Sequence, residues 1–232
     1  MSTVPSGQRI DPETLDFHAL PADCFAAIIS LTSPLDACRL SLVSPFFNSV
    51  ASSDAVWVKF LPVDYQNLFP APHSVSSLKD LYLNLCDHPV LIEDGKKSFS
   101  LDKRSGQKCY MLAARNLAIT WGDTPRYWTW ISRPNSRFPE VVKLLIDFRI
   151  IGATVRIGGT QVSKRIVYVI DSRDDVQNGE QYPKVRGDGW FEVELGEFFN
   201  GGELEKLEIY IFSFDGYSVG GLYVQGIDIR PS

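Results

Sequence analysis

The sequence predicts an α+β fold in which a small all-helical unit at the N-terminal end precedes an antiparallel β-sandwich. Up to about residue 88, apolar residues recur at helical spacing, and Ser-Pro pairs separate the segments. From Cys109 onward, short runs of strand-forming residues are separated by Gly-containing turns, with no helical pattern between them. With 232 residues and 44% hydrophobic content, the chain is long enough for one large or two modest domains.

The helical unit is predicted over residues 18–62, after a Ser-, Pro- and Gly-rich leader at 1–17 that we expect to be mobile. Asp23 is placed to cap the first helix, and Ser-Pro pairs at 33–34 and 44–45 break the chain where new helices begin. Helices this short cannot close a sizeable core alone. The unit therefore needs a partner, which is either the rest of the chain or another protein.

A connector with one helix is predicted over residues 63–97. The helix should cover 75–88, with Ser74 or Ser76 as its cap and Pro89 ending it. Its apolar face would carry Leu78, Leu81, Tyr82 and Leu85. The stretch 93–106 is charged and short of periodicity, so no element is predicted there.

Strands are predicted through the C-terminal half. In residues 141–150 the even positions are apolar, while Lys143, Asp147 and Arg149 occupy odd positions, which is typical of a half-buried strand. Apolar residues alternate with Glu208 and Tyr210 in the same manner. The predicted strands are 109–113, 116–121, 127–132, 141–150, 153–157, 165–170, 190–195, 207–214 and 222–229.

Three of the five tryptophans lie in one stretch, residues 120–130. Gly122, Asp123 and Pro125 suit a tight bend, which would place Trp121 and Trp128 close together on its two sides. Flat rings near a turn can form a platform for a sugar ring, with a neighbouring polar group fixing its orientation. The competing interpretation is that these rings belong to the core, where tryptophan is usually buried.

Charge and composition exclude several classes of protein. A net charge of −5 and a pI near 5.2 argue against a nucleic-acid binder. The four cysteines have no CxxC spacing and no nearby histidine cluster, so we expect no metal site and no cofactor. No apolar run resembles a signal peptide or is long enough to enter a bilayer. These features favour a reducing setting in the cytoplasm and nucleus.

The sequence gives little support for catalysis. Glu192 and Glu194 lie two positions apart on a predicted strand, which suits a glycosidase carboxylate pair, but such pairs usually come from different strands. We interpret them as a solvated strand face with Phe191, Val193 and Leu195 buried behind. All three histidines precede residue 89, so the β half lacks a histidine base. The chain is predicted not to be an enzyme.

Residues 18–62 resemble an F-box. The motifs that carry the resemblance follow one another in the family's order: Leu20-Pro21, Ser33-Pro34, Leu42-Val43-Ser44, and Trp57 after Ser52-Ser53-Asp54. The resemblance implies docking onto Skp1, the adaptor that joins F-box proteins to the cullin of an SCF-type (Skp1–cullin–F-box) ubiquitin ligase. The residues expected to face Skp1, or to support the surface that does, are Leu20, Pro21, Phe25, Ile28, Leu42, Val43 and Trp57. Alternatively, these apolar residues are internal core.

Residues 98–232 carry a second resemblance. The runs Met111-Leu112-Ala113-Ala114-Arg115, Tyr127-Trp128-x-Trp130, Asp188-Gly189-Trp190 and Asp228-Ile229-Arg230-Pro231 are similar to the phloem protein 2 family of plants, which includes the tobacco jasmonate-induced lectin. This resemblance implies a lectin-like sandwich of the jelly-roll type that binds N-glycans or N-acetylglucosamine oligomers. It assigns Trp121 and Trp128 to the two aromatic positions of the sugar site.

The chain departs from that family at two places. The lectin also uses acidic residues on a strand near its C-terminus, where this chain has Phe212 and Ser213, with Glu205 and Glu208 as approximate counterparts. The middle is also short, as if a strand pair were missing before the Asp-Gly-Trp motif. The sandwich would then close differently or leave an edge exposed, or the half would not fold.

Together these patterns predict the substrate-recognition subunit of an SCF-type ligase, with Skp1 and a glycan or glycoprotein target as partners. The alternative is a carbohydrate-binding stress-response lectin without a ligase role. A third interpretation is that the sandwich recognises protein instead of sugar.

Overall fold

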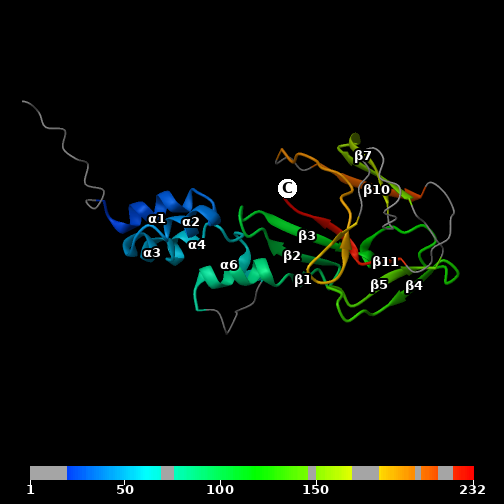
Figure 1. Ribbon diagram of the computed structural model, residues 1–232, viewed down its shortest axis with the longest axis horizontal. Coiled ribbons are helices and arrows are strands. Elements are labelled where there is room, and N and C mark those ends of the chain that lie inside the picture. Colours follow the sequence, from blue (N-terminus) through cyan, green and yellow to red (C-terminus); the bar gives the residue numbers. More distant parts are fainter. Residues whose placement is uncertain (1–19, 69–75, 146–149, 169–182, 202–204, 214–221) are drawn as a thin grey trace, which may run out of the picture. The chain divides into compact units, whose positions relative to one another are not determined.

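The computed structural model describes residues 20–68, 76–145, 150–168, 183–201, 205–213 and 222–232 (Figure 1). The chain divides into two compact units. One holds the helices together with Ser100–Cys109 and Arg230–Ser232, and the other holds Leu91–Phe99 and Tyr110–Ile229. Helices come first and antiparallel sheets follow, so the predicted α+β class is confirmed. The predicted leader at 1–17 lies outside the described residues.

Six helices are described, and a preceding serine caps three of them. The Ser33 hydroxyl accepts a hydrogen bond from the Asp36 backbone N–H at 3.1 Å and donates one to the Asp36 carboxylate at 2.8 Å. Ser44 and Ser77 accept equivalent bonds at the starts of two other helices. The helices are α1 (Ala22–Ser30), α2 (Pro34–Leu40), α3 (Pro45–Ala51), α4 (Asp54–Trp57), α5 (Tyr65–Leu68) and α6 (Leu78–Asp87).

Two predicted caps are wrong. The residue before α1 is Pro21, which has no side-chain acceptor, and Asp23 lies inside the first turn. Ser77 caps α6 because its hydroxyl reaches the Asp80 N–H, while Ser76 donates to the Asp80 carboxylate. Ser74 lies outside the described residues.

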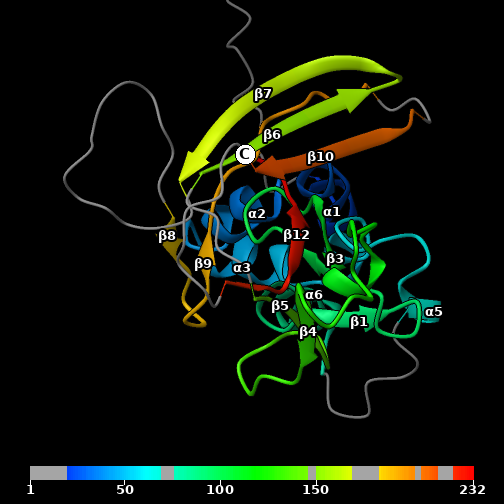
Figure 2. The ribbon, with the colours of Figure 1, turned by 90° about the vertical axis from the view of Figure 1, so that its right-hand side faces the viewer.

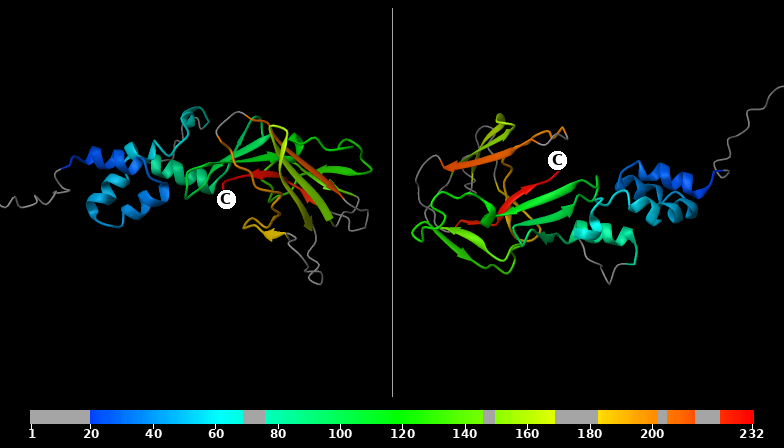
Figure 3. Two further views of the ribbon diagram at one scale, coloured as in Figure 1. Left: turned by 90° about the horizontal axis from the view of Figure 1, so that it is seen from above. Right: turned by 180° about the vertical axis from the view of Figure 1, so that it is seen from behind.

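Aromatic side chains form the centre of the helical unit. Trp57 on α4 is only 1% exposed, donates its indole N–H to the Ala51 carbonyl at 2.7 Å, and packs on Tyr82 of α6 with ring centroids 5.1 Å apart. Phe25 on α1 makes edge contacts with Phe46 and Phe47 of α3. Figure 3 shows α1 to α4 gathered together with α6 beside them. The helix of the connector therefore completes the core that the short helices cannot close alone.

The second unit is built from four small sheets. Figure 2 shows β7, β6 and β10 side by side in that order. The first sheet has the order β1 (Val90–Ile92), β2 (Lys97–Leu101), β3 (Lys108–Ala113), β12 (Gly226–Ile229), and the second has β10 (Leu207–Ser213), β6 (Ile150–Ile157), β7 (Thr160–Tyr168). The third has β11 (Tyr223–Val224), β5 (Val141–Leu144), β4 (Trp128–Ile131), and the fourth pairs β8 (Lys184–Val185) with β9 (Phe191–Glu192).

The predicted single strand over 141–150 is two strands in different sheets. β5 pairs with β4 and β11, whereas β6, which begins at Ile150, pairs with β7 and β10. Between them, residues 146–149 lie outside the described residues. The sequence does not predict β2, because polar and apolar residues there do not follow the alternation of buried and exposed positions. The polar Ser98 is buried beside Phe99 and accepts a hydrogen bond from Arg137.

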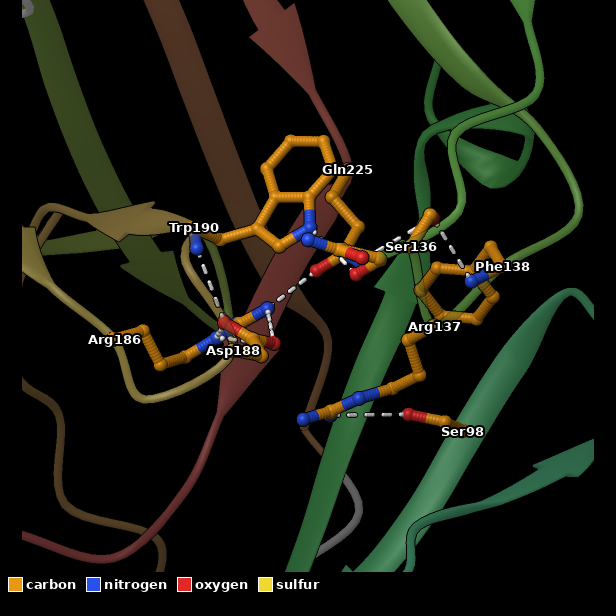
Figure 4. A network of polar contacts seen from close by, with 9 residues as sticks. Ser98, Ser136, Arg137, Phe138, Arg186, Asp188, Trp190 and Gln225 are labelled. Atoms are coloured by element: carbon orange, nitrogen blue, oxygen red, sulfur yellow. Dashed lines mark hydrogen bonds and ion pairs between the residues drawn. The ribbon is translucent and has the colours of Figure 1, made fainter.

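A polar network ties the Asp-Gly-Trp motif into this unit (Figure 4). The Arg186 guanidinium donates to both Asp188 carboxylate oxygens and, at 2.6 Å, to the side-chain oxygen of Gln225, which is buried. Gly189 adopts φ +85°, which favours glycine, and Trp190 donates its indole N–H to the Asn135 carbonyl at 2.8 Å. The Asp-Gly-Trp motif therefore has a structural role, because its contacts hold this turn against Gln225 and Asn135.

Candidate functional site

The helical unit exposes a group of large apolar side chains, which we call the apolar surface residues. They lie on α1, at its ends, and in the turn between α2 and α3: Leu20, Ile28, Leu31, Leu42 and Val43. Leu31 is 87% exposed and Leu42 is 85% exposed. Single exposed apolar residues are ordinary, but this many on so small a unit indicates an interaction surface.

The structure divides the seven predicted docking residues into two groups. Pro21 and four of the apolar surface residues are exposed, whereas Phe25 and Trp57 are buried in the helical core. The buried pair can only support the surface. Sequence reasoning missed Leu31, although its spacing of three from Ile28 could have placed both on one side of α1.

The second candidate site is the loop before β4, residues 117–127, which we call the aromatic loop. It consists of successive tight turns, closed by bonds from the Gly122 N–H to the Ile119 carbonyl and from the Thr124 N–H to the Trp121 carbonyl. Trp121 adopts φ +55°, which is uncommon for a large residue. The predicted strand over 116–121 is therefore wrong, because a short 3₁₀ turn at Ala114–Asn116 and these turns replace it.

Two indole N–H groups hold the aromatic loop against β4. Trp128 donates to the Thr120 carbonyl at 3.1 Å, and Trp130 donates to the Gly122 carbonyl at 3.3 Å. The Arg115 guanidinium lies 3.7 Å from the centre of the Trp130 ring and pairs with Glu140 at 2.9 Å. Since both donors are used internally, these tryptophans offer a ligand only their ring surfaces.

The two tryptophans that the sequence places together make no ring contact in the described structure, although the Trp128 indole bonds to the carbonyl of Thr120, the residue before Trp121. Trp121 is 66% exposed and packs on Tyr127, with ring centroids 5.4 Å apart. Trp128 is half-buried and, with Trp130, lines a shallow hollow of about 300 Å³. The lining of that hollow does not include Trp121, and among the described residues no ring contact joins Trp121 to Trp128.

The hollow also contains a carboxylate. Asp123 is exposed, lines the hollow beside Trp128, and has no side-chain hydrogen bond or ion pair among the described residues. A carboxylate next to an aromatic ring can accept hydrogen bonds from sugar hydroxyls. Of the two acidic counterparts expected near the C-terminus, Glu208 is already bonded to Lys206 at 2.7 Å. Asp123 is therefore a candidate acceptor that the sequence analysis did not single out.

Other candidate chemistry finds structural uses. Glu194 forms an ion pair with Arg165, and β9 ends at Glu192, so the two carboxylates do not share one strand. Phe191, which was predicted to be buried, is exposed. Burial raises the pKa of the Cys86 thiol to about 11, so that thiol stays protonated. Within the described ranges, no cluster of His, Cys, Asp or Glu could hold a metal ion, and no helix is long and apolar enough to cross a membrane.

Comparisons with known proteins agree with both halves of the structure. The F-box domain model matches residues 17–59, and the Phloem protein 2 model matches residues 107–150 and 146–231. The chain belongs to the F-box proteins with a phloem protein 2 domain. It is 41% identical to F-box protein At2g02240 of Arabidopsis thaliana, over 97% of this chain and 83% of that protein. It is 39% identical to F-box protein PP2-B10 of the same plant, over 97% of each.

The match of this F-box protein to its family is interrupted once, and its alignment to a relative contains gaps. The phloem protein 2 match falls into two parts that meet at residues 146–150, between β5 and β6. The alignment with PP2-B10 runs over 265 positions, whereas this chain has 232 residues, so at least 33 positions (265 − 232) have no residue here. The break in the family match falls where the chain passes from one sheet to another.

Proposed function

We propose that this F-box protein is the non-catalytic substrate-recognition subunit of an SCF-type ubiquitin ligase, acting in the cytoplasm and nucleus. Its F-box would bind Skp1 and, through Skp1, a cullin. The observation that carries the proposal is the exposure of the apolar surface residues on an F-box whose own core is already filled by Phe25 and Trp57. Apolar side chains that do not fill the core remain available for a partner.

The cargo-binding part of the proposal concerns the aromatic loop. The hollow beside Trp128 is large enough for one sugar unit, and Asp123 supplies an acceptor in it. Trp121 and Tyr127 offer further ring surface on the same loop. These features support recognition of a glycan or glycoprotein target. In this proposal, Trp128 forms part of the hollow while Trp121 contacts a neighbouring sugar unit or the protein that carries the glycan.

Binding to Skp1 is tested with the full chain and the double variant Leu42→Asp/Val43→Asp, compared with Val63→Asp. Val63 is a fully exposed valine of the same unit outside the predicted set, so its variant controls for adding charge to the surface. Loss of binding in the double variant alone supports the proposal. Equal binding by all three proteins contradicts it. A chain that binds glycans but never Skp1 would instead be a stress-response lectin without a ligase role.

Glycan binding is tested on an array of N-glycans and N-acetylglucosamine oligomers with Trp121→Ala and Trp128→Phe. Trp128→Phe keeps a ring but removes the N–H that anchors the loop, whereas Trp121 makes no such anchor in the described structure. We expect Trp121→Ala to weaken binding without changing the circular dichroism spectrum. Unchanged binding would remove Trp121 from the site.

A further inference from the structure

A second hollow lies on one face of the β10-β6-β7 sheet, away from the aromatic loop in sequence. It has a volume of about 230 Å³ and is lined by Thr154, Arg156, Tyr210 and Phe212. In the strand register, Tyr210 lies directly opposite Thr154, and Phe212 lies opposite Gly152. Since side chains alternate between faces, these residues share one face. On it, the small Gly152 and Thr154 of the central strand lie opposite the large rings of its neighbour, and Arg156 follows on the central strand.

Thr154 at the floor of this hollow is an unusual residue. It is only 7% exposed, yet its hydroxyl has no hydrogen-bond partner among the described residues. Buried polar groups in folded proteins are nearly always paired, because an unpaired one loses its bonds to water without replacement. A buried hydroxyl that faces a hollow and has no partner among the described residues is what a site for a hydrogen-bonding ligand requires.

The walls of the hollow combine aromatic surface with positive charge. Tyr210 and Phe212 are both substantially exposed, and the Arg156 guanidinium lies 5.2 Å from the centre of the Tyr210 ring. Lys164 lies opposite Thr154 on the other neighbouring strand and is also exposed. The nearest acidic residue on this face is Glu208, which lies directly opposite Arg156 in the strand register and is bonded to Lys206. Arg156, Lys164 and Lys206 together therefore outnumber this one carboxylate. The face therefore attracts an anion.

We propose that this hollow binds an acidic saccharide, with a pyranose ring against Tyr210 and Phe212, a sugar hydroxyl bonded to Thr154, and the sugar carboxylate paired with Arg156. The rings are open to solvent, which suits a sugar that keeps its outer hydroxyls hydrated. A flat apolar ligand would need a site that encloses most of its surface. The inference stands apart from the aromatic loop, since no residue is shared between the two hollows.

The test is calorimetric titration of the full chain with a galacturonic acid trimer and with a neutral galactose trimer. We expect the acidic trimer to bind at least about tenfold more tightly, because only it carries carboxylates for Arg156. Thr154→Val keeps the shape of the side chain and removes the hydroxyl, and should weaken binding about tenfold. Thr160→Val, an exposed threonine of β7, is the matched control and should bind like the wild type.

Arg156→Gln should reduce the affinity for the acidic trimer to that for the neutral one. The inference is overturned if the acidic trimer does not bind, if both trimers bind equally, or if Thr154→Val binds as well as Thr160→Val. It is also overturned if Trp128→Phe alone abolishes binding, which would place the sugar at the aromatic loop. Unfolding midpoints measured for every variant ensure that lost binding is not lost folding.

Discussion

Leu42 provides a quantitative test of the docking surface. Its side chain lies in the turn between α2 and α3 and is 85% exposed, so it contributes almost nothing to the helical core. Truncation to alanine should therefore leave the free energy of unfolding within about 0.5 kcal/mol of the wild-type value. If Skp1 covers this surface, the same truncation removes apolar area that becomes buried only in the complex.

The expected loss of affinity follows from the exposed area. Leu42→Ala removes three carbon groups, each worth about 0.8 kcal/mol when buried. Scaling by the 85% of the side chain that is still exposed gives about 2 kcal/mol, or roughly a 30-fold rise in Kd. Truncation of Val63, which is exposed but outside the predicted set, should change Kd less than about twofold.

Surface-immobilised Skp1 titrated with the wild type, Leu42→Ala and Val63→Ala gives the three dissociation constants directly. Urea unfolding of the same proteins checks that stability is unchanged. A rise below about threefold for Leu42→Ala, or equal rises for both variants, would refute the assignment. Phe25 and Trp57 are unsuitable for this test, because both are buried and their substitution would disrupt the helices themselves.

Four further outcomes follow from the structure. Trp57→Ala should lower the free energy of unfolding of the helical unit by about 3–5 kcal/mol, measured in urea, because it removes a fully buried indole; a change below 1 kcal/mol would contradict this packing. Asp123→Asn should weaken glycan binding at least about tenfold, measured on the array, while the exposed control Asp94→Asn should not. Thr154→Val should raise the free energy of unfolding by about 1 kcal/mol, since it removes a buried hydroxyl that has no partner in the described part of the chain; destabilisation would reveal a partner for it. The hydrogen bond from Arg186 lowers the pKa of the Asp188 carboxyl below its usual 3.8. The ionised carboxylate therefore stabilises the fold fully above pH 3.8, and this stabilisation is lost as the pH falls through the lowered pKa. The melting temperature should drop more steeply below pH 4 in the wild type than in Asp188→Asn.

Much of the fold can be predicted because it depends on local signals. Ser-Pro pairs mark the starts of α2 and α3, since serine supplies the cap and proline fits the first turn. Alternating residues mark β10 and β5. The break between β5 and β6 could not be predicted, because the alternation passes through residues 144–150 while the strands join different sheets. Which sheet a strand joins depends on contacts distant in sequence.

In the candidate sites too, local sequence predicts which residues take part, whereas their exposure depends on contacts distant in sequence. The sequence indicates which residues are apolar or aromatic, but not that Phe25 lies inside while Leu42 lies outside, since both fit one helical pattern. The turns around Gly122, which replace the predicted strand, are held by indole bonds from β4. Thr154 gave no signal at all, because a threonine in a strand is ordinary unless its burial and its bonds are known.

The most direct test of the central claim is a titration of purified Skp1 with the full chain, followed by size-exclusion chromatography. We expect a stable one-to-one complex in which the apolar surface residues become protected from solvent, as followed by hydrogen exchange at Ile28, Leu31 and Leu42. A chain that stays separate from Skp1, or a complex that leaves the exchange of these residues unchanged, would contradict it.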